Sequence, residues 1–190
     1  MSGNANVRAL LLTAALTGLR ASELRGLRWS DVDLKTCELH VRQRASRYCE
    51  IGAPKSESSR RSVPIEPKIL LPALKAWKLA CPLGDLVFPT ADGRIAHHEQ
   101  LLRALAPVMM VAGVVDKAGK PKYALHAFRH FFASWCINPV DRGGRGLSAK
   151  VVQGLLGHSS IVMTLDVYGH LFPRGDDQNE LAAAARRLLG

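Results

Sequence analysis

The sequence has 190 residues, of which 47% are hydrophobic, and a formal net charge of +10. This length favours one folded domain, and the positive charge favours a polyanionic partner such as nucleic acid, although charge alone leaves a solvated basic surface equally open. The four cysteines are far apart and form no CxxC pair, which argues against a zinc site or a disulfide framework. Neither a signal peptide nor an apolar run near the roughly 20 residues that span a bilayer is evident, so we expect a cytoplasmic protein.

The first part of the chain predicts two helices. Apolar residues at helical spacing predict a largely buried helix over about residues 7–16, which Gly18 should end. Arg20 is then expected at a turn, and Ser22 can cap a short second helix.

Strand signals follow. Alternating apolar and polar residues predict a half-buried strand over residues 37–42, and two further short strands are expected at residues 48–51 and 62–65. A polar turn containing Gly and Pro joins the last two strands. Lys55 is expected at or near the tip of this hairpin, where its side chain can reach a ligand.

The second half of the chain is predicted to be helical. Helices are expected over about residues 67–80, 97–112, 126–137, 148–156 and 161–168, with a last helix over about residues 177–189. The fold class is therefore α+β, mainly helical, with a small three-stranded antiparallel sheet at one edge.

Three residues of the helix at 126–137 can do chemistry. His126 and Arg129 are three residues apart, so they share one helix face and can touch one phosphate. His130 forms with His126 a pair that resembles a zinc helix, but Ala127 occupies the position of the glutamate in HExxH and no third ligand is evident. We therefore expect no metal, and we predict that His130 supports or packs against the site.

His158 follows Gly157 just beyond a helix end, and Tyr168 supplies a hydroxyl ten residues later. Each of these residues, like Arg20 and Lys55, also has an ordinary interpretation: a capping histidine, a half-buried tyrosine, a salt bridge to Glu23 or a solvated lysine. Their occurrence together favours chemistry on a phosphodiester, which needs fixed positive donors and one nucleophilic oxygen. Nearby cations are expected to lower the pKa of the phenol.

At this point the chain resembles the catalytic domain of the tyrosine recombinase, or phage integrase, family, over about residues 7–173. The resemblance rests on five motifs in the family's order: TGLRASEL at residues 17–24 with LRWSDVD at 27–33, PKSESSRRSVP at 54–64, LHAFRHFFAS at 125–134, LGHSSI at 156–161, and YGHL at 168–171.

The resemblance implies that Tyr168 attacks a DNA phosphodiester, forms a 3′-phosphotyrosine and releases a 5′-hydroxyl. Arg20 and Arg129 are implied to clamp the non-bridging oxygens, and Lys55 to protonate the leaving 5′-oxygen. His126 is implied as the base that helps to deprotonate the tyrosine, or as a phosphate ligand.

His158 is implied to donate a hydrogen bond to the phosphate, and Glu23 to support the site by orienting an arginine. The resemblance implies double-stranded DNA as the partner, a homotetramer on DNA that is a monomer or weak oligomer when free, and a bacterial or phage-encoded protein associated with the nucleoid. No cofactor and no membrane partner are expected.

The chain departs from the family in two respects. Nothing corresponds to the family's N-terminal core-binding domain, so residues 1–173 are expected to be the catalytic domain of a fragment, followed by a linker and helix over residues 174–190 that pack in cis or are exchanged between subunits. The stretch over residues 138–146 is long, and we prefer a surface loop to a DNA-binding segment. Candidate DNA contacts are Arg60, Arg61, Arg142 and Arg145.

Two other functions stay open at this point. The chain can be a DNA-binding module that is inert without its missing half, or a type IB topoisomerase that relaxes supercoils. The complete set of six catalytic residues favours the enzyme over the module, and the segment from Leu156 to Tyr168 looks more like an integrase than a topoisomerase.

Overall fold

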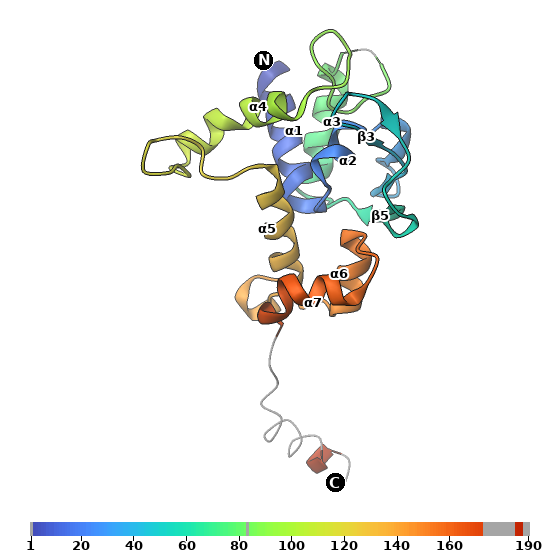
Figure 1. Ribbon diagram of the computed structural model, residues 1–190, viewed down its shortest axis with the longest axis vertical. Helices are drawn as coiled ribbons and strands as arrows, with labels where there is room; N and C mark the ends of the chain where they lie inside the picture. Colours follow the sequence, from blue (N-terminus) through green and yellow to red (C-terminus); the bar gives the residue numbers. More distant parts are fainter. Residues whose placement is uncertain (1, 83, 173–184, 188–190) are drawn as a thin grey trace.

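The structure is a computed structural model that describes residues 2–82, 84–172 and 185–187 (Figure 1). The helices are α1 (Ser2–Thr17), α2 (Ala21–Arg25), α3 (Leu70–Ala80), α4 (His98–Val111), α5 (Leu125–Ile137), α6 (Ala149–Leu156) and α7 (Ile161–Tyr168). The strands are β1 (Val32–Asp33), β2 (Glu38–Val41), β3 (Arg44–Ala45), β4 (Ile51–Gly52) and β5 (Arg61–Pro64). The predicted class, mainly helical with a small antiparallel sheet, is confirmed.

The sheet differs from the prediction in one strand. The three-stranded antiparallel sheet has the order β1-β2-β5, and Leu39 at its centre pairs with Val32 on one side and Val63 on the other. The predicted strand at residues 48–51 is mostly a turn, and its last residue belongs to β4, which pairs with β3 instead. β1 was not predicted, because two residues are too few to show the alternation of apolar and polar side chains that marks a strand.

The main core forms around α1, which packs against α3 and α5 (Figure 1). Leu10 and Ala14 of α1 are buried, as are Leu74 of α3 and Phe132 of α5. The turn after α1 needs glycine: Gly18 has φ +62°, and a Cβ atom there would lie 2.3 Å from the Phe132 ring. This close approach fixes the direction in which the chain leaves α1 toward Arg20.

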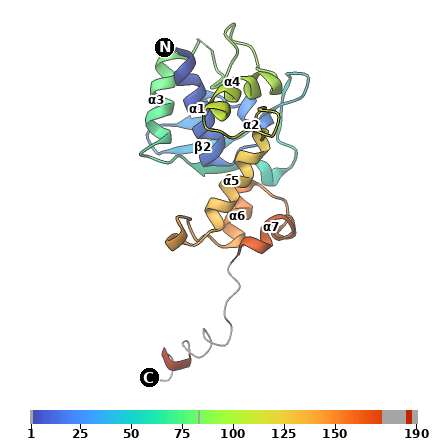
Figure 2. The ribbon, with the colours of Figure 1, turned by 90° about the vertical axis from the view of Figure 1, so that its left-hand side faces the viewer.

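The chain divides visibly into an upper body and a lower helical unit. Helices α1 to α4 and the strands form the body, α5 runs downward from it, and α6 and α7 lie at the lower end of α5 (Figures 1 and 2). α6 also contacts β5, so the lower unit meets the body at the sheet. The candidate site lies where these two parts meet.

The structure differs from the prediction at two turns. Arg20, not Ser22, is the N-cap residue of α2, and the Glu23 carboxylate accepts a hydrogen bond from the Arg20 backbone N–H at 2.8 Å. Lys55 lies in an exposed connection, but β4 and β5 on either side of it pair with other strands rather than with each other. The segment is therefore a link between two small sheets and not a hairpin.

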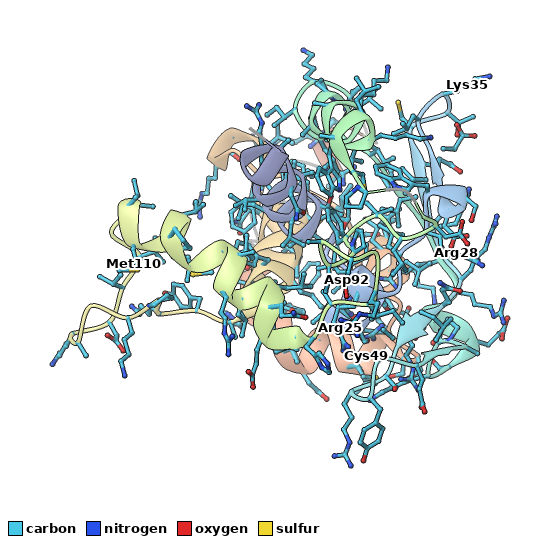
Figure 3. The ribbon with its side chains drawn as sticks, turned by 90° about the horizontal axis from the view of Figure 1, so that it is seen from above. Arg25, Arg28, Lys35, Cys49, Asp92 and Met110 are labelled. Atoms are coloured by element: carbon cyan, nitrogen blue, oxygen red, sulfur yellow. The ribbon has the colours of Figure 1, made fainter. Side chains whose placement is uncertain are left out.

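The buried side chain of Arg25 attaches the turn between β3 and β4 to the body. It donates to the Ala96 carbonyl at 2.5 Å and to Cys49 Sγ at 3.1 Å, and Arg25 and Cys49 lie together in Figure 3. Met110, in contrast, lies far out on the projecting α4.

The loop over residues 138–146 is ordered against α5. The Arg145 N–H donates to the Trp135 carbonyl at 2.9 Å, and the Arg145 guanidinium lies 5.3 Å from the centre of the Trp135 ring. The predicted helix over residues 177–189 falls almost wholly outside the described residues, so its packing stays a prediction. None of the helices in the described part of the chain is long and apolar enough to cross a membrane.

Candidate active site

The C-terminal end of α6 organises the site. Three successive carbonyl groups there accept hydrogen bonds from three different arginines: Arg61 Nε donates to Leu155 at 2.7 Å, Arg129 Nη2 to Leu156 at 2.6 Å, and Arg20 Nη2 to Gly157 at 3.1 Å. The last carbonyls of a helix lack partners within the helix and carry the negative end of its dipole, so they suit cations. One helix end thus assembles guanidinium groups from three distant parts of the sequence.

Glu23 holds two of these arginines in place. Its carboxylate is 3% exposed and accepts from Arg61 Nη2 at 2.9 Å and from Arg20 Nη1 at 2.9 Å. Burial alone would raise the pKa of Glu23, but the hydrogen bonds and positive charges of Arg61 and Arg20 outweigh burial and lower it below its ordinary value. The residue expected to orient one arginine therefore contacts two.

Arg129 is the most enclosed cation of the site. It is 2% exposed, and besides Leu156 it binds the Gly18 carbonyl through Nη1 at 2.7 Å. Burial, followed by the positive charges of Arg20 and Arg61, lowers the pKa of Arg129 to about 9, which still leaves it protonated at neutral pH. Arg129 therefore joins the end of α1 to the end of α6.

His158 lies directly after this helix end. Gly157 adopts the left-handed conformation, with φ +64°, which turns the chain out of α6. His158 Nδ1 lies 2.9 Å from the buried Thr164 hydroxyl, and burial together with the charges of Arg129, Arg20 and Arg61 lowers the pKa of His158 to about 4. The imidazole is therefore neutral at pH 7. When Thr164 donates to Nδ1, the hydrogen resides on Nε2 and can be donated to a phosphate.

Tyr168 is the last residue of α7 and is 4% exposed. Its hydroxyl lies 2.9 Å from His130 Nδ1, and the His130 ring lies 4.7 Å from the His126 ring, edge to face. Burial raises the pKa of Tyr168, and the opposing effect of Arg129 is smaller. The expectation of a lowered pKa is therefore wrong for the net shift: Arg129 does lower the pKa, but removal of the phenol from water outweighs that charge.

Lys55 and Arg20 line a shared cavity of about 200 Å³. Gly157, Ser159 and Arg44 of β3 also line it. Among the residues that the structure describes, the buried Arg44 Nε finds no hydrogen-bond partner, whereas a buried N–H normally has one. Neither Tyr168 nor Arg129 lines this cavity. The positive charge of Arg129 nevertheless acts to lower the pKa of both Tyr168 and His158.

The four candidate DNA contacts fall into different environments. Arg60 and Arg142 are exposed, as a DNA contact requires, and Arg60 pairs with Glu57 at 3.6 Å. Arg145 is partly covered by Trp135. The Arg61 side chain is only 5% exposed and is paired with Glu23, so its contacts in the structure lie within the protein.

Sequence reasoning missed two residues of this arrangement and gave a third another role. Arg44 had no motif around it, and Thr164 carries no signal of its own. Arg61 was expected as a DNA contact, and its pairing with Glu23 was not anticipated.

Comparisons with known proteins identify relatives of the whole described domain. The model of the phage integrase family matches residues 2–174. A tyrosine recombinase XerC-like protein of Caldanaerobacter subterraneus subsp. tengcongensis is 31% identical over 88% of this chain and 46% of that protein. The ICEBs1 integrase of Bacillus subtilis is 29% identical over 186 residues, covering 93% of this chain and 47% of that protein. The chain thus spans about half the length of these curated relatives.

Solved structures share the fold. The Tn1549 transposon integrase in complex with transposon right end DNA aligns with a TM-score of 0.69 at 22% identity, over 96% of this chain and 58% of that chain. The XerA recombinase aligns with a TM-score of 0.65 at 23% identity, over 98% of this chain and 58% of that chain.

Proposed function

This chain belongs to the phage integrase family, and on that premise we propose that it is the catalytic part of a site-specific DNA recombinase or integrase. The observation that carries the proposal is the convergence of Arg20 and Arg129 on adjacent carbonyls at the end of α6, directly before His158, with Arg129 also within electrostatic reach of Tyr168. These are the fixed positive donors and the hydroxyl that attack on a phosphodiester requires.

In the proposed reaction, the Tyr168 oxygen forms a bond to the phosphorus and the bond from phosphorus to the 5′-oxygen breaks. The product is a 3′-phosphotyrosine. Arg20 and Arg129 neutralise the growing charge on the non-bridging oxygens, and each such donor contributes roughly 3–4 kcal/mol to the transition state. Lys55 gives a proton to the leaving 5′-oxygen, and His158 donates from Nε2.

The reverse reaction rejoins DNA when a 5′-hydroxyl attacks the phosphotyrosine. The covalent bond retains the free energy of the broken phosphodiester, so no nucleotide cofactor is required. Exchange of strands between two duplexes takes four cleavages, and we infer a homotetramer on double-stranded DNA that is a monomer or weak oligomer when free. The net charge of +10 and the exposed Arg60 and Arg142 support salt-sensitive DNA binding.

The deciding experiment is covalent capture. The chain is incubated with a library of nicked duplexes that carry random sequence around the nick, protein–DNA adducts that survive SDS are isolated, and their DNA is sequenced. We expect an adduct from the wild-type chain and none from Tyr168→Phe. An adduct that persists in Tyr168→Phe would place the nucleophile elsewhere.

The main competitor is an inert DNA-binding module. This alternative predicts salt-dependent DNA binding by the chain and no adduct under any condition. The same experiment therefore separates the two functions.

A further inference from the structure

The hydroxyl of Tyr168 has one defined partner among the described side chains, and that partner is His130. The two atoms, Tyr168 Oη and His130 Nδ1, are 2.9 Å apart. The ring centres are 5.6 Å apart, and the residues come from α7 and α5. A histidine expected only to support or pack the site is thus in contact with the reacting atom.

We propose that His130 is a catalytic residue that accepts the proton of Tyr168, whereas His126 acts on the phenol only through His130. This inference rests on the proposed function. It changes the identity of the base, and it leaves His126 available as a phosphate ligand.

The geometry supports this division between the two histidines. His126 meets the His130 ring edge to face with ring centres 4.7 Å apart, and its structural partner is that ring rather than the tyrosine hydroxyl. A base must lie within about 2.6–3.2 Å of the oxygen that it deprotonates, and His130 satisfies this condition before DNA binds.

The other polar groups near Tyr168 do not fit the role. Arg129 has only N–H donors, so it cannot accept a proton. His158 Nδ1 is engaged with Thr164 at 2.9 Å. Lys55 lines a cavity that Tyr168 does not line. In the proposed reaction Lys55 must also start protonated, because it gives its proton to the leaving 5′-oxygen.

The step balances with these residues alone. As the Tyr168 oxygen bonds to phosphorus, its hydrogen moves to the lone pair of His130 Nδ1, and the imidazole becomes imidazolium. The 5′-oxygen leaves with the electron pair of the broken bond and takes a proton from Lys55. His130 is exposed, so the imidazolium can pass its proton to water or return it during rejoining.

Burial of the Tyr168 phenol explains why the reaction needs a base. The Tyr168 pKa is raised in the DNA-free protein, so spontaneous ionisation of the phenol is suppressed. A neutral imidazole at hydrogen-bond distance allows the proton to leave while the new bond forms, and no free phenolate is needed beforehand.

The test uses a duplex recovered by covalent capture and compares single-turnover adduct formation by the wild type with that by His130→Ala, His130→Asn and His126→Ala. We expect His130→Ala to slow adduct formation by about 10²–10⁴-fold with unchanged DNA affinity. Added imidazole should restore much of the rate, because the position is exposed. His130→Asn keeps a hydrogen-bond acceptor near Nδ1 but cannot take the proton, so it should stay slow.

His98→Asn, at an exposed histidine of α4, is the matched control and should cleave at the wild-type rate. Thermal unfolding of each variant checks that the fold is intact.

Three results would overturn the inference while leaving the proposed function in place. The first is a wild-type rate in His130→Ala. The second is a wild-type rate in His130→Asn. The third is rescue of His126→Ala, but not of His130→Ala, by added imidazole. Absence of an adduct from the wild type is a different result, because it refutes the proposed function and this inference together.

Discussion

The arginine side and the lysine side of the candidate site are held in opposite ways. Arg129 is 2% exposed and binds the backbone of both α1 and α6. Lys55 is exposed, lies in a connection between two small sheets, and makes no hydrogen bond or ion pair within the described residues. The groups assigned to the phosphate are therefore part of the folded framework, whereas the group assigned to the leaving oxygen is not.

This difference fits what each group has to do. A phosphate oxygen needs donors that do not reorganise as charge develops, and burial among backbone carbonyls provides such donors. A proton donor must meet an oxygen that arrives with the DNA, so a free side chain suffices until then. Substitutions on the two sides should consequently separate folding stability from catalysis.

The largest loss of stability is expected for Arg129→Ala. The change leaves the Gly18 and Leu156 carbonyls without a partner in a buried region, and each such group costs about 1–3 kcal/mol. We expect the free energy of unfolding in urea to fall by about 4 kcal/mol once the cavity is included. Arg142→Ala, at an exposed arginine, is the control and should stay within about 0.5 kcal/mol.

Glu23→Gln should have the next largest effect. It removes the negative charge between Arg61 and Arg20, and breaking a buried ion pair costs about 3 kcal/mol. The folded pKa of Glu23 is lowered, so its contribution is present above the ordinary value of 4.5 and is lost as pH falls through the folded pKa. Urea unfolding at pH 7 and at pH 3 should show the difference between wild type and variant shrinking at the lower pH. A difference of the same size at both values would contradict the pairing.

His158 should contribute a smaller, pH-dependent term. Its folded pKa is about 4, below the ordinary 6.5, so the unfolded chain binds the extra proton first as pH falls. Stability is therefore greatest above pH 6.5 and declines toward pH 4, on the order of 1 kcal/mol for this partly buried group. His158→Asn should flatten that decline when urea unfolding is measured across the range. An unchanged slope would mean that other groups, such as His126, produce it.

Lys55→Met should leave stability within about 0.5 kcal/mol, which is the smallest effect of the four. Adduct formation should nevertheless fall by about 10²–10⁴-fold, because a general acid is lost. A substrate with a 5′-bridging sulfur needs no protonation of its leaving group, so it should restore the rate. Failure of that substrate to help would assign Lys55 to phosphate binding instead.

The sequence predicted most of the helices and strands and the positions of several candidate residues along them, because the helix periodicity and the motifs are local patterns. Arg20 at a turn after α1, His158 beyond the end of α6 and Tyr168 on α7 are where the pattern put them. Catalytic roles for these residues stay proposals until cleavage is measured.

Three features lay beyond sequence reasoning for physical reasons. The contact between Arg61 and Glu23 joins residues 38 positions apart and depends on how α6 packs on β5. The direction of the Tyr168 pKa shift follows from a balance between burial and charge, and only packing sets that balance. The hydrogen bond between Tyr168 and His130 depends on the angle between α5 and α7, which no local pattern encodes.

The end of α6 also restricts which insertions and deletions this sequence can tolerate in evolution. Its three carbonyls each accept a hydrogen bond from a guanidinium of a different segment. The helix fixes the directions of these carbonyls relative to one another, and so it acts as a template for the three arginines. Inserting or deleting one residue within Ala149–Leu156 would rotate that template by about 100° and detach all three arginines at once. Length variation should be tolerated in the loop before α6 and eliminated within the helix itself.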